Sequence, residues 1–88
     1  MRIIVRYQGR VQGVGFRATV RSLARPLPVT GFVRNEPDGS VYMEVQGERV
    51  SIAQLREAIR DRMARYIQSE VGTDAVDIAG ESEFIIAR

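Results

Sequence analysis

The stretch Gly9-Arg10-Val11-Gln12-Gly13-Val14-Gly15-Phe16-Arg17 connects a predicted strand to a predicted helix. Residues 2–7 before it are rich in β-branched and aromatic side chains, which is typical of a strand. From Phe16 onward, apolar residues recur at the spacing of one helix face (Phe16, Val20, Leu23 and Ala24). Glycines let successive N–H groups converge, and a helix N-terminus leaves N–H groups unpaired and carries partial positive charge. With the planar donor fork of Arg17 beside them, these groups predict a loop that binds a phosphate.

A second stretch, Gly31-Phe32-Val33-Arg34-Asn35, begins a predicted hairpin. Residues 30–35 form the first strand, and residues 36–39 (Glu-Pro-Asp-Gly) form the turn, since proline presets one φ angle and glycine allows a positive one. Residues 41–46 alternate apolar and polar side chains, as expected for a half-buried strand paired antiparallel to the first. The hairpin therefore places Asn35 at the end of a strand, and we expect it close to the 9–17 loop.

The C-terminal half of the chain predicts a second helix and two further strands. Ser51-x-x-Gln54 matches a capping box, so we expect the helix to begin there, with Arg56, Arg60 and Arg62 facing water. The buried stripe of this helix is Ile52, Leu55, Ile59 and Met63. Residues 84–87 are predicted as a short last strand. Residues 66–71 are either a fourth strand or, by periodicity alone, part of a helix that runs on to residue 72.

This order of elements predicts a ferredoxin-like βαββαβ sandwich of the α+β class, an antiparallel sheet with two helices on one face. We expect residues 1–88 to form a single domain. No apolar run approaches the roughly 18 residues that span a bilayer, and no signal-peptide pattern opens the chain. We therefore expect a cytoplasmic monomer that binds neither membrane nor nucleic acid.

The composition excludes several kinds of chemistry. The chain has no cysteine, histidine or lysine, and all 13 of its basic residues are arginine. It therefore has no thiolate nucleophile, no phosphohistidine, no Ser-His-Asp relay and no P-loop lysine. A zinc site is not expected without Cys or His ligands, and no clustered acidic motif predicts a magnesium site. The net charge of +2 is too small to argue for nucleic acid.

The two quoted stretches resemble the two signatures of the acylphosphatase family. The first signature is roughly Gly-x-Val-Gln-Gly-Val-x-Phe-Arg, which residues 9–17 match at every defined position. The second is roughly Gly-(Trp/Phe/Tyr)-Val-(Arg/Lys/Gln)-Asn-x-x-x-Gly-x-Val-x5-Gly, which residues 31–47 match. The resemblance covers nearly all of the chain, and it implies that residues 66–71 form a fourth strand. Residues 61–65 depart from it, because typical members have a Gly-Pro pair after the second helix.

The resemblance implies hydrolysis of acyl phosphates to a carboxylate and inorganic phosphate, with neither metal nor cofactor. Arg17 would bind the phosphoryl oxygens, and Asn35 would hold the attacking water through an amide that offers both a donor and an acceptor. The backbone N–H groups of the loop would complete the cradle. They belong to Gln12, Gly13, Val14, Gly15, Phe16 and Arg17.

Some assignments stay open from the sequence alone. Gln12 either orients the loop or touches substrate. Phe16 and Phe32 are expected in the core, Arg34 as a solvated strand residue, and the Arg56/Arg60 pair as a hydrated helix face. Two other functions compete with the hydrolase. One is a non-catalytic module that binds phosphate or carbamoyl phosphate, as in larger hydrogenase-maturation proteins, whose zinc-finger cysteines this chain lacks. The other is an RNA-binding sheet, whose aromatic motif is incomplete here.

Overall fold

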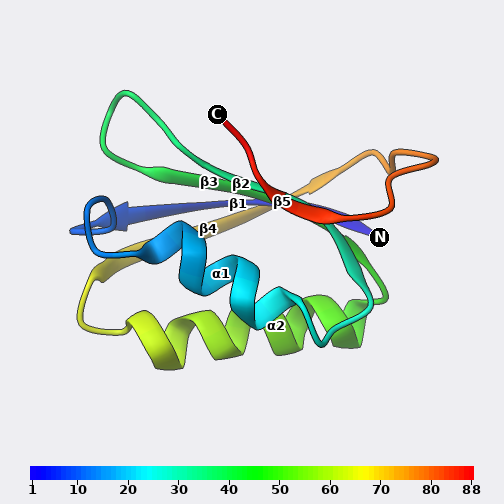
Figure 1. Ribbon diagram of the computed structural model, residues 1–88, viewed down its shortest axis with the longest axis horizontal. Coiled ribbons are helices and arrows are strands. Elements are labelled where there is room, and N and C mark those ends of the chain that lie inside the picture. The colour runs from blue at the N-terminus through cyan, green and yellow to red at the C-terminus, as the bar shows by residue number, and fades with distance from the viewer.

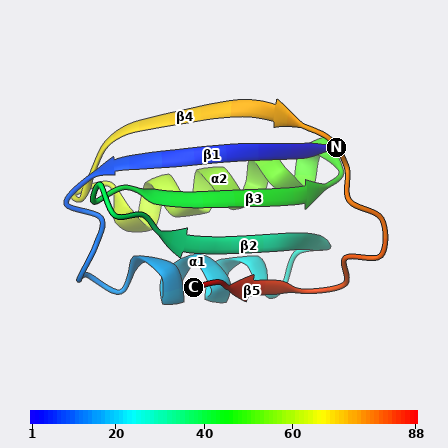
Figure 2. The same cartoon turned by 90° about the horizontal axis from the view of Figure 1, so that it is seen from above.

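The computed structural model describes residues 1–88 as one sheet backed by two helices (Figure 1). The strands are β1 (Arg2–Gly9), β2 (Val29–Asn35), β3 (Val41–Gly47), β4 (Ile67–Ala75) and β5 (Phe84–Ile86), and the helices are α1 (Phe16–Ala24) and α2 (Arg49–Met63). The strand order across the sheet is β4-β1-β3-β2-β5, as Figure 2 shows. Both helices cover the same face (Figure 1), and the opposite face is open.

The strand pairing confirms the predicted ferredoxin-like sandwich and adds one feature to it. β1 pairs antiparallel with β3 and β4, and β2 pairs antiparallel with β3 as the predicted hairpin. β5 instead runs parallel to β2, with Val33 opposite Ile86. A parallel neighbour has to be reached by a crossover, and the segment between β4 and β5 provides it by crossing the end of the sheet (Figure 2).

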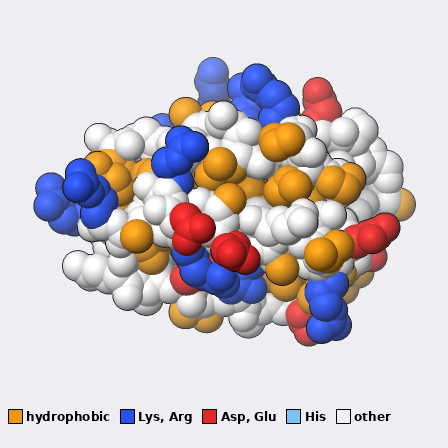
Figure 3. Space-filling view, turned by 90° about the horizontal axis from the view of Figure 1, so that it is seen from below, with side chains coloured by type: hydrophobic (Ala, Val, Ile, Leu, Met, Phe, Trp, Pro, Cys, Tyr) orange, Lys and Arg blue, Asp and Glu red, His pale blue; other side chains and the backbone are white.

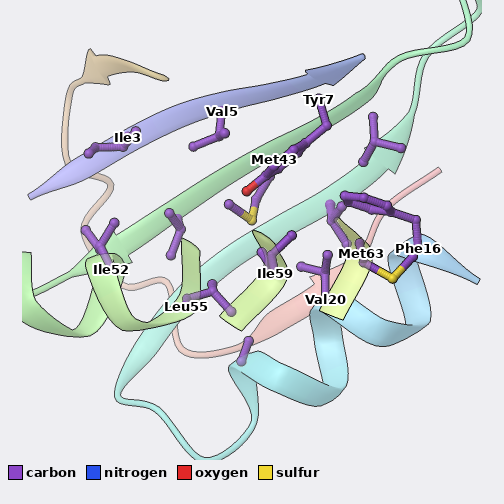
Figure 4. Close-up of a cluster of buried hydrophobic side chains, with 14 of the residues drawn as sticks. Ile3, Val5, Tyr7, Phe16, Val20, Met43, Ile52, Leu55, Ile59 and Met63 are labelled. Atoms are coloured by element: carbon purple, nitrogen blue, oxygen red, sulfur yellow. The ribbon is translucent and has the colours of Figure 1, made fainter. Parts of the chain in front are cut away.

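The core lies between the sheet and the helices, as the predicted apolar faces require. Alternate residues of β1 and β3 point inward, and the predicted stripe of α2 meets them (Figure 4). Fully burying one side chain of this size contributes about 1.5–3 kcal/mol. The labelled members of this cluster are Ile3, Val5, Tyr7, Phe16, Val20, Met43, Ile52, Leu55, Ile59 and Met63. Neither helix combines the length and apolar composition that crossing a membrane requires.

The predicted start of the second helix is wrong by one turn. α2 begins at Arg49 after the extended residue Glu48, with no side-chain cap. The N–H of Ile52 already donates to the carbonyl of Glu48, so Ser51 lies inside the first turn and is buried. The capping-box residues do not set the start of this helix, because the chain turns into the helix directly after β3 ends at Gly47. The fourth strand is confirmed but is longer than predicted, because antiparallel pairing with β1 extends it to Ala75.

The expectation that Arg56 and Arg60 form a hydrated face holds only for Arg60, which is exposed, whereas Arg56 is partly buried. Both guanidinium groups donate to the carboxylate of Glu70 on β4, Arg56 at 2.8 Å. The buried hydroxyl of Tyr7 donates to the same carboxylate at 3.3 Å. Burial alone would raise the pKa of Glu70, but its hydrogen bonds from Arg56 and Arg60 bring the pKa below the usual range. The cluster ties α2 to the β1–β4 edge, whereas Arg62 is exposed as predicted.

Candidate active site

The predicted phosphate-binding loop lies at one end of the sheet, beside the β2–β3 turn (Figure 2). Gly13 and Gly15 both have φ of 77°, a left-handed conformation that side chains disfavour. A Cβ atom at either position would meet nothing within 4 Å. Glycine is therefore required here by backbone conformation and not by crowding, and the space in front of the loop is open to a ligand.

The loop and the first turn of α1 present a run of unpaired N–H groups. No backbone N–H from Val11 to Ala18 donates to another group of the protein. α1 has neither a side-chain cap nor an acidic residue in its first turn. The positive end of the helix is thus left uncompensated, and such a helix start is suited to bind an anion.

Arg17 and Asn35 meet in one cavity of about 220 Å³ at this end of the molecule. Arg17 is the second residue of α1, is partly exposed, and takes part in none of the ion pairs of the chain. Basic side chains project at this end of the helical face, and others are spread over its top, middle and lower right among the acidic ones (Figure 3). The lining of the cavity consists of Val11, Gly13, Gly15, Phe16, Arg17, Ala18, Asn35 and Ile86.

Asn35 is the last residue of β2 and lies on the helix-covered side of the sheet, because it alternates in phase with the buried Val33. Its Oδ1 atom is buried and accepts no hydrogen bond from the protein. Leaving a buried acceptor unpaired costs about 1–3 kcal/mol. Such an atom beside an anion-binding loop is suited to hold a polar ligand.

Gln12 connects the two halves of the site. Its side-chain amide donates to the carbonyl of Glu36 at 2.8 Å and to the carbonyl of Ser40 at 2.9 Å. The Ser40 carbonyl also accepts the N–H of Glu36, which closes the turn after Asn35. Of the two roles left open by the sequence, these bonds favour orientation of the loop.

Two further predicted site residues, Phe16 and Val14, pack their side chains in or against the core. Phe16 is buried as expected, and its ring packs on that of Tyr7 with centroids 5.1 Å apart. Val14 is partly buried and packs against the core. Phe16 also lines the cavity, whereas Val14 does not, and the N–H groups of both have no partner in the protein.

Phe32 does not belong to the core, contrary to expectation. It lies on the open face of the sheet and stacks on Tyr42 with centroids 6.0 Å apart. Arg34 is only partly solvated, because its guanidinium lies 4.5 Å from the centroid of the Tyr42 ring and pairs with Glu36. Strand alternation explains both placements, since residues 32 and 34 are out of phase with the buried Val33.

Three lining residues, Val11, Ala18 and Ile86, were not among the predicted site residues. Ala18 follows Arg17 directly on α1 and carries no polar atom in its side chain. Ile86 comes from the last strand, far from both signatures, and reaches the cavity because β5 pairs with β2 in parallel. Only the register of that pairing could have revealed it.

The fold and this cavity define a class of protein: a ferredoxin-like sandwich with unpaired N–H groups beside a cavity at the start of its first helix. The family model for acylphosphatase matches residues 3–86. An acylphosphatase of Salinibacter ruber is 48% identical over 79 residues, covering 86% of this chain and 83% of that protein. The chain therefore belongs to the acylphosphatase family and is an enzyme of the hydrolase class.

Two further comparisons place the chain among related proteins. The crystal structure of acylphosphatase from Bacillus subtilis superposes with a TM-score of 0.88 at 26% identity, covering 99% of this chain and 98% of that one. The carbamoyltransferase HypF2 of Cupriavidus necator is 48% identical over 60 residues, which are 68% of this chain but 7% of that protein. The fold thus also occurs as a small part of a much larger protein.

Proposed function

We propose that this enzyme hydrolyses acyl phosphates and that Arg17, Asn35 and the 11–18 backbone carry the reaction. One observation carries the proposal: the N–H groups of residues 11–18 have no partner in the protein, and most of this segment lines one cavity together with the unpaired guanidinium of Arg17 and with Asn35, whose buried amide oxygen is unpaired. The first two kinds of group bind the phosphoryl oxygens. The third binds a water molecule. Membership of the acylphosphatase family supports the same substrate.

In the proposed reaction, the oxygen of water forms a bond to phosphorus while the bond from phosphorus to the acyl oxygen breaks. The carboxylate leaves with the electron pair of that bond, and the proton of the water passes to the phosphate that is released. The bond that breaks needs no general acid, because a carboxylate with a pKa of about 4 is stable as an anion. This accounts for a site built without histidine or cysteine.

The protein then supplies position and charge stabilisation. Phosphoryl transfer passes through a loose transition state in most analyses, with charge spread over the equatorial oxygens. N–H groups and a guanidinium fixed in advance stabilise that charge without reorganising. Asn35 Oδ1 accepts a hydrogen bond from the attacking water, which satisfies the acceptor that the fold leaves unpaired.

Gln12 has a positioning role in this scheme. Arg17 belongs to the loop–helix segment, whereas Asn35 belongs to the hairpin. The two hydrogen bonds of the Gln12 amide join these segments across 24 and 28 residues of sequence. They hold the water-binding amide at a fixed place relative to the phosphate cradle.

The test is hydrolysis of benzoyl phosphate in EDTA by the wild-type chain, Arg17→Ala and Arg21→Ala. Arg21 is an exposed arginine one turn further along α1 and outside the cavity, so it controls for loss of charge on the helix. We expect metal-independent turnover that Arg17→Ala abolishes and Arg21→Ala preserves. Equal activity in wild type and Arg17→Ala would refute the assigned role.

A binding module is the second candidate, because of the match to the carbamoyltransferase HypF2. A folded wild-type chain that binds inorganic phosphate through Arg17 but turns over neither benzoyl phosphate nor acetyl phosphate would favour it. Titration with phosphate, monitored by calorimetry, separates this outcome from a chain that does not bind phosphate at all.

A further inference from the structure

The lining of the cavity that holds Arg17 and Asn35 is of two chemical kinds. The polar part consists of backbone N–H groups, the guanidinium and the amide. The apolar part consists of the buried Val11 and Phe16 and the exposed Ala18 and Ile86. Ile86 is a large apolar side chain with 37% of its surface exposed at the edge of a polar site.

The position of Ile86 is fixed by the sheet. In the parallel register it lies opposite Val33, and the N–H of Ala87 donates to the Val33 carbonyl at 2.9 Å. Ile86 therefore shares the helix-covered side of β2 with Asn35, two residues further along that strand. Ile85 pairs with Phe32 and faces the opposite, open side, with 46% of its surface exposed. Neighbouring isoleucines thus lie on opposite faces, and only one of them lines the cavity.

We propose that Ile86 and Ala18 form a subsite for the acyl group and that this subsite selects acyl phosphates whose acyl group is apolar. The proposal rests on the proposed function and extends it to the substrate class. With the phosphoryl group held by the N–H groups and Arg17, the acyl group extends from the same cavity. Ile86 and Ala18 are the part of the lining that offers it apolar contact without a polar group to desolvate.

The size of the cavity limits the group that fits. Pockets that enclose drug-sized ligands measure about 300–1,000 Å³, and this cavity measures about 220 Å³. A phosphate together with one aromatic ring or a short branched chain fills it, and a longer chain projects into solvent. A benzoyl group therefore gains contact with Ile86 that an acetyl group, with its single methyl, does not reach fully.

The test compares benzoyl phosphate with acetyl phosphate in wild type, Ile86→Ser and Ile85→Ser. One lost apolar contact of this kind changes kcat/KM by roughly tenfold. We expect Ile86→Ser to lower kcat/KM about tenfold for benzoyl phosphate and less than about threefold for acetyl phosphate. Inhibition by inorganic phosphate should be unchanged. Ile85→Ser, the matched control on the other face, should leave the ratio of the two substrates as in wild type.

An equal loss for both substrates, or none, in a folded Ile86→Ser would overturn the subsite. If that variant does not fold, Ile86→Val keeps an apolar side chain in the strand. We then expect a smaller drop in the ratio of kcat/KM for benzoyl phosphate to kcat/KM for acetyl phosphate. An unchanged ratio contradicts the proposal. Benzoylphosphonate and acetylphosphonate, which have no P–O–C bond to hydrolyse, give the same comparison by calorimetry. Failure of wild-type turnover thus tests the proposed function, and the ratio of the two phosphonate affinities tests the subsite by itself.

Discussion

At the end of the sheet where the chain begins, Arg2 is almost completely buried and fully partnered, whereas at the opposite end Arg17 has no partner in the protein. The guanidinium of Arg2 donates to Glu44 at 2.8 Å, to Gln46 at 3.0 Å and to Glu81 at 2.8 Å. Gln46 in turn binds the backbone of Ile78, so these contacts fasten the crossover that leads to β5. Figure 2 shows how far this crossover lies from the phosphate loop.

The difference separates stability from function. Buried polar groups are normally satisfied within the fold, and those that are not require an explanation. The buried guanidinium of Arg2 has carboxylate and amide partners, and these hydrogen bonds stabilise the crossover. Arg17 and Asn35 Oδ1 have no such partners, although the chain has 11 acidic residues. Unpaired groups at one end and paired ones at the other therefore mark where a ligand belongs.

The largest effect is expected from Arg17→Ala. Removing one preorganised donor costs roughly 10²–10³ in rate, and a charged bidentate donor should exceed that. Because the Arg17 side chain makes no hydrogen bond or ion pair within the protein, the melting temperature should stay within about 2 °C of wild type. Benzoyl phosphate kinetics check the loss of rate, and a thermal melt checks the unchanged melting temperature. A large drop in the melting temperature would contradict the contrast with Arg2.

Asn35→Ala should lower kcat by roughly 10²-fold, since the water loses its acceptor. Its effect on stability should be the reverse of an ordinary core substitution. The change removes a buried acceptor that the fold leaves unpaired, so the free energy of unfolding should stay level or rise. Denaturant unfolding beside the activity assay measures this. A clear loss of stability would show that Asn35 holds the hairpin, as a turn residue would.

Arg2→Met should give the opposite result, with stability reduced and activity kept. The variant leaves Glu44 and Glu81 close together without their shared cation, at a cost of about 1–3 kcal/mol. The site lies at the other end of the sheet, so kcat and KM at 25 °C should change less than about twofold. Urea unfolding measures the loss of stability, and steady-state kinetics measure whether activity is kept. Lost activity in a folded Arg2→Met would mean that the two ends are coupled.

Gln12→Met tests whether the segments that carry Arg17 and Asn35 act as one unit. The variant keeps the length of the side chain but removes both donors to the hairpin. We expect kcat to fall about tenfold, which corresponds to about 1.4 kcal/mol, while inhibition by inorganic phosphate stays the same. In an Asn35→Ala background the same change should cost little, because the group that it positions is gone.

The matched control for Gln12→Met is Gln8→Met, because Gln8 is exposed on β1 and its side chain accepts a hydrogen bond from Ser69 instead of binding the hairpin. It should behave as wild type. A parallel loss of phosphate inhibition in Gln12→Met would show that Gln12 contacts the substrate directly, and full additivity with Asn35→Ala would show that the two residues act separately.

The sequence predicted most of the fold, and it predicted that Asn35 lies close to the 9–17 loop, because both depend on local patterns. Alternation in residues 41–46, the turn at residues 36–39 and the glycines of the loop each express a rule that acts over a few residues. Three features do not follow from such local rules: the start of α2, the binding of Glu70 by Arg56 and Arg60, and the placement of Ile86. They depend on which strand lies next to which and in what register, and no periodicity along the chain encodes that information.

The smallest expected effect is the acid sensitivity of the contacts around Arg2. The hydrogen bond from Arg2 keeps the pKa of Glu81 below its usual range. Burial would raise the pKa of Glu44, but hydrogen bonds from Tyr42 and Arg2 outweigh it and leave that pKa lowered as well. A carboxyl whose pKa is lower in the folded state adds stability above its unfolded pKa and loses it as the pH falls through the folded one. The free energy of unfolding should thus decline below about pH 4.5, and less steeply in Arg2→Met. Urea unfolding between pH 7 and pH 3 measures the two slopes. Parallel curves would mean that Arg2 does not set these pKa values, and would leave Glu70, bound by Arg56 and Arg60, as the carboxylate that governs acid unfolding.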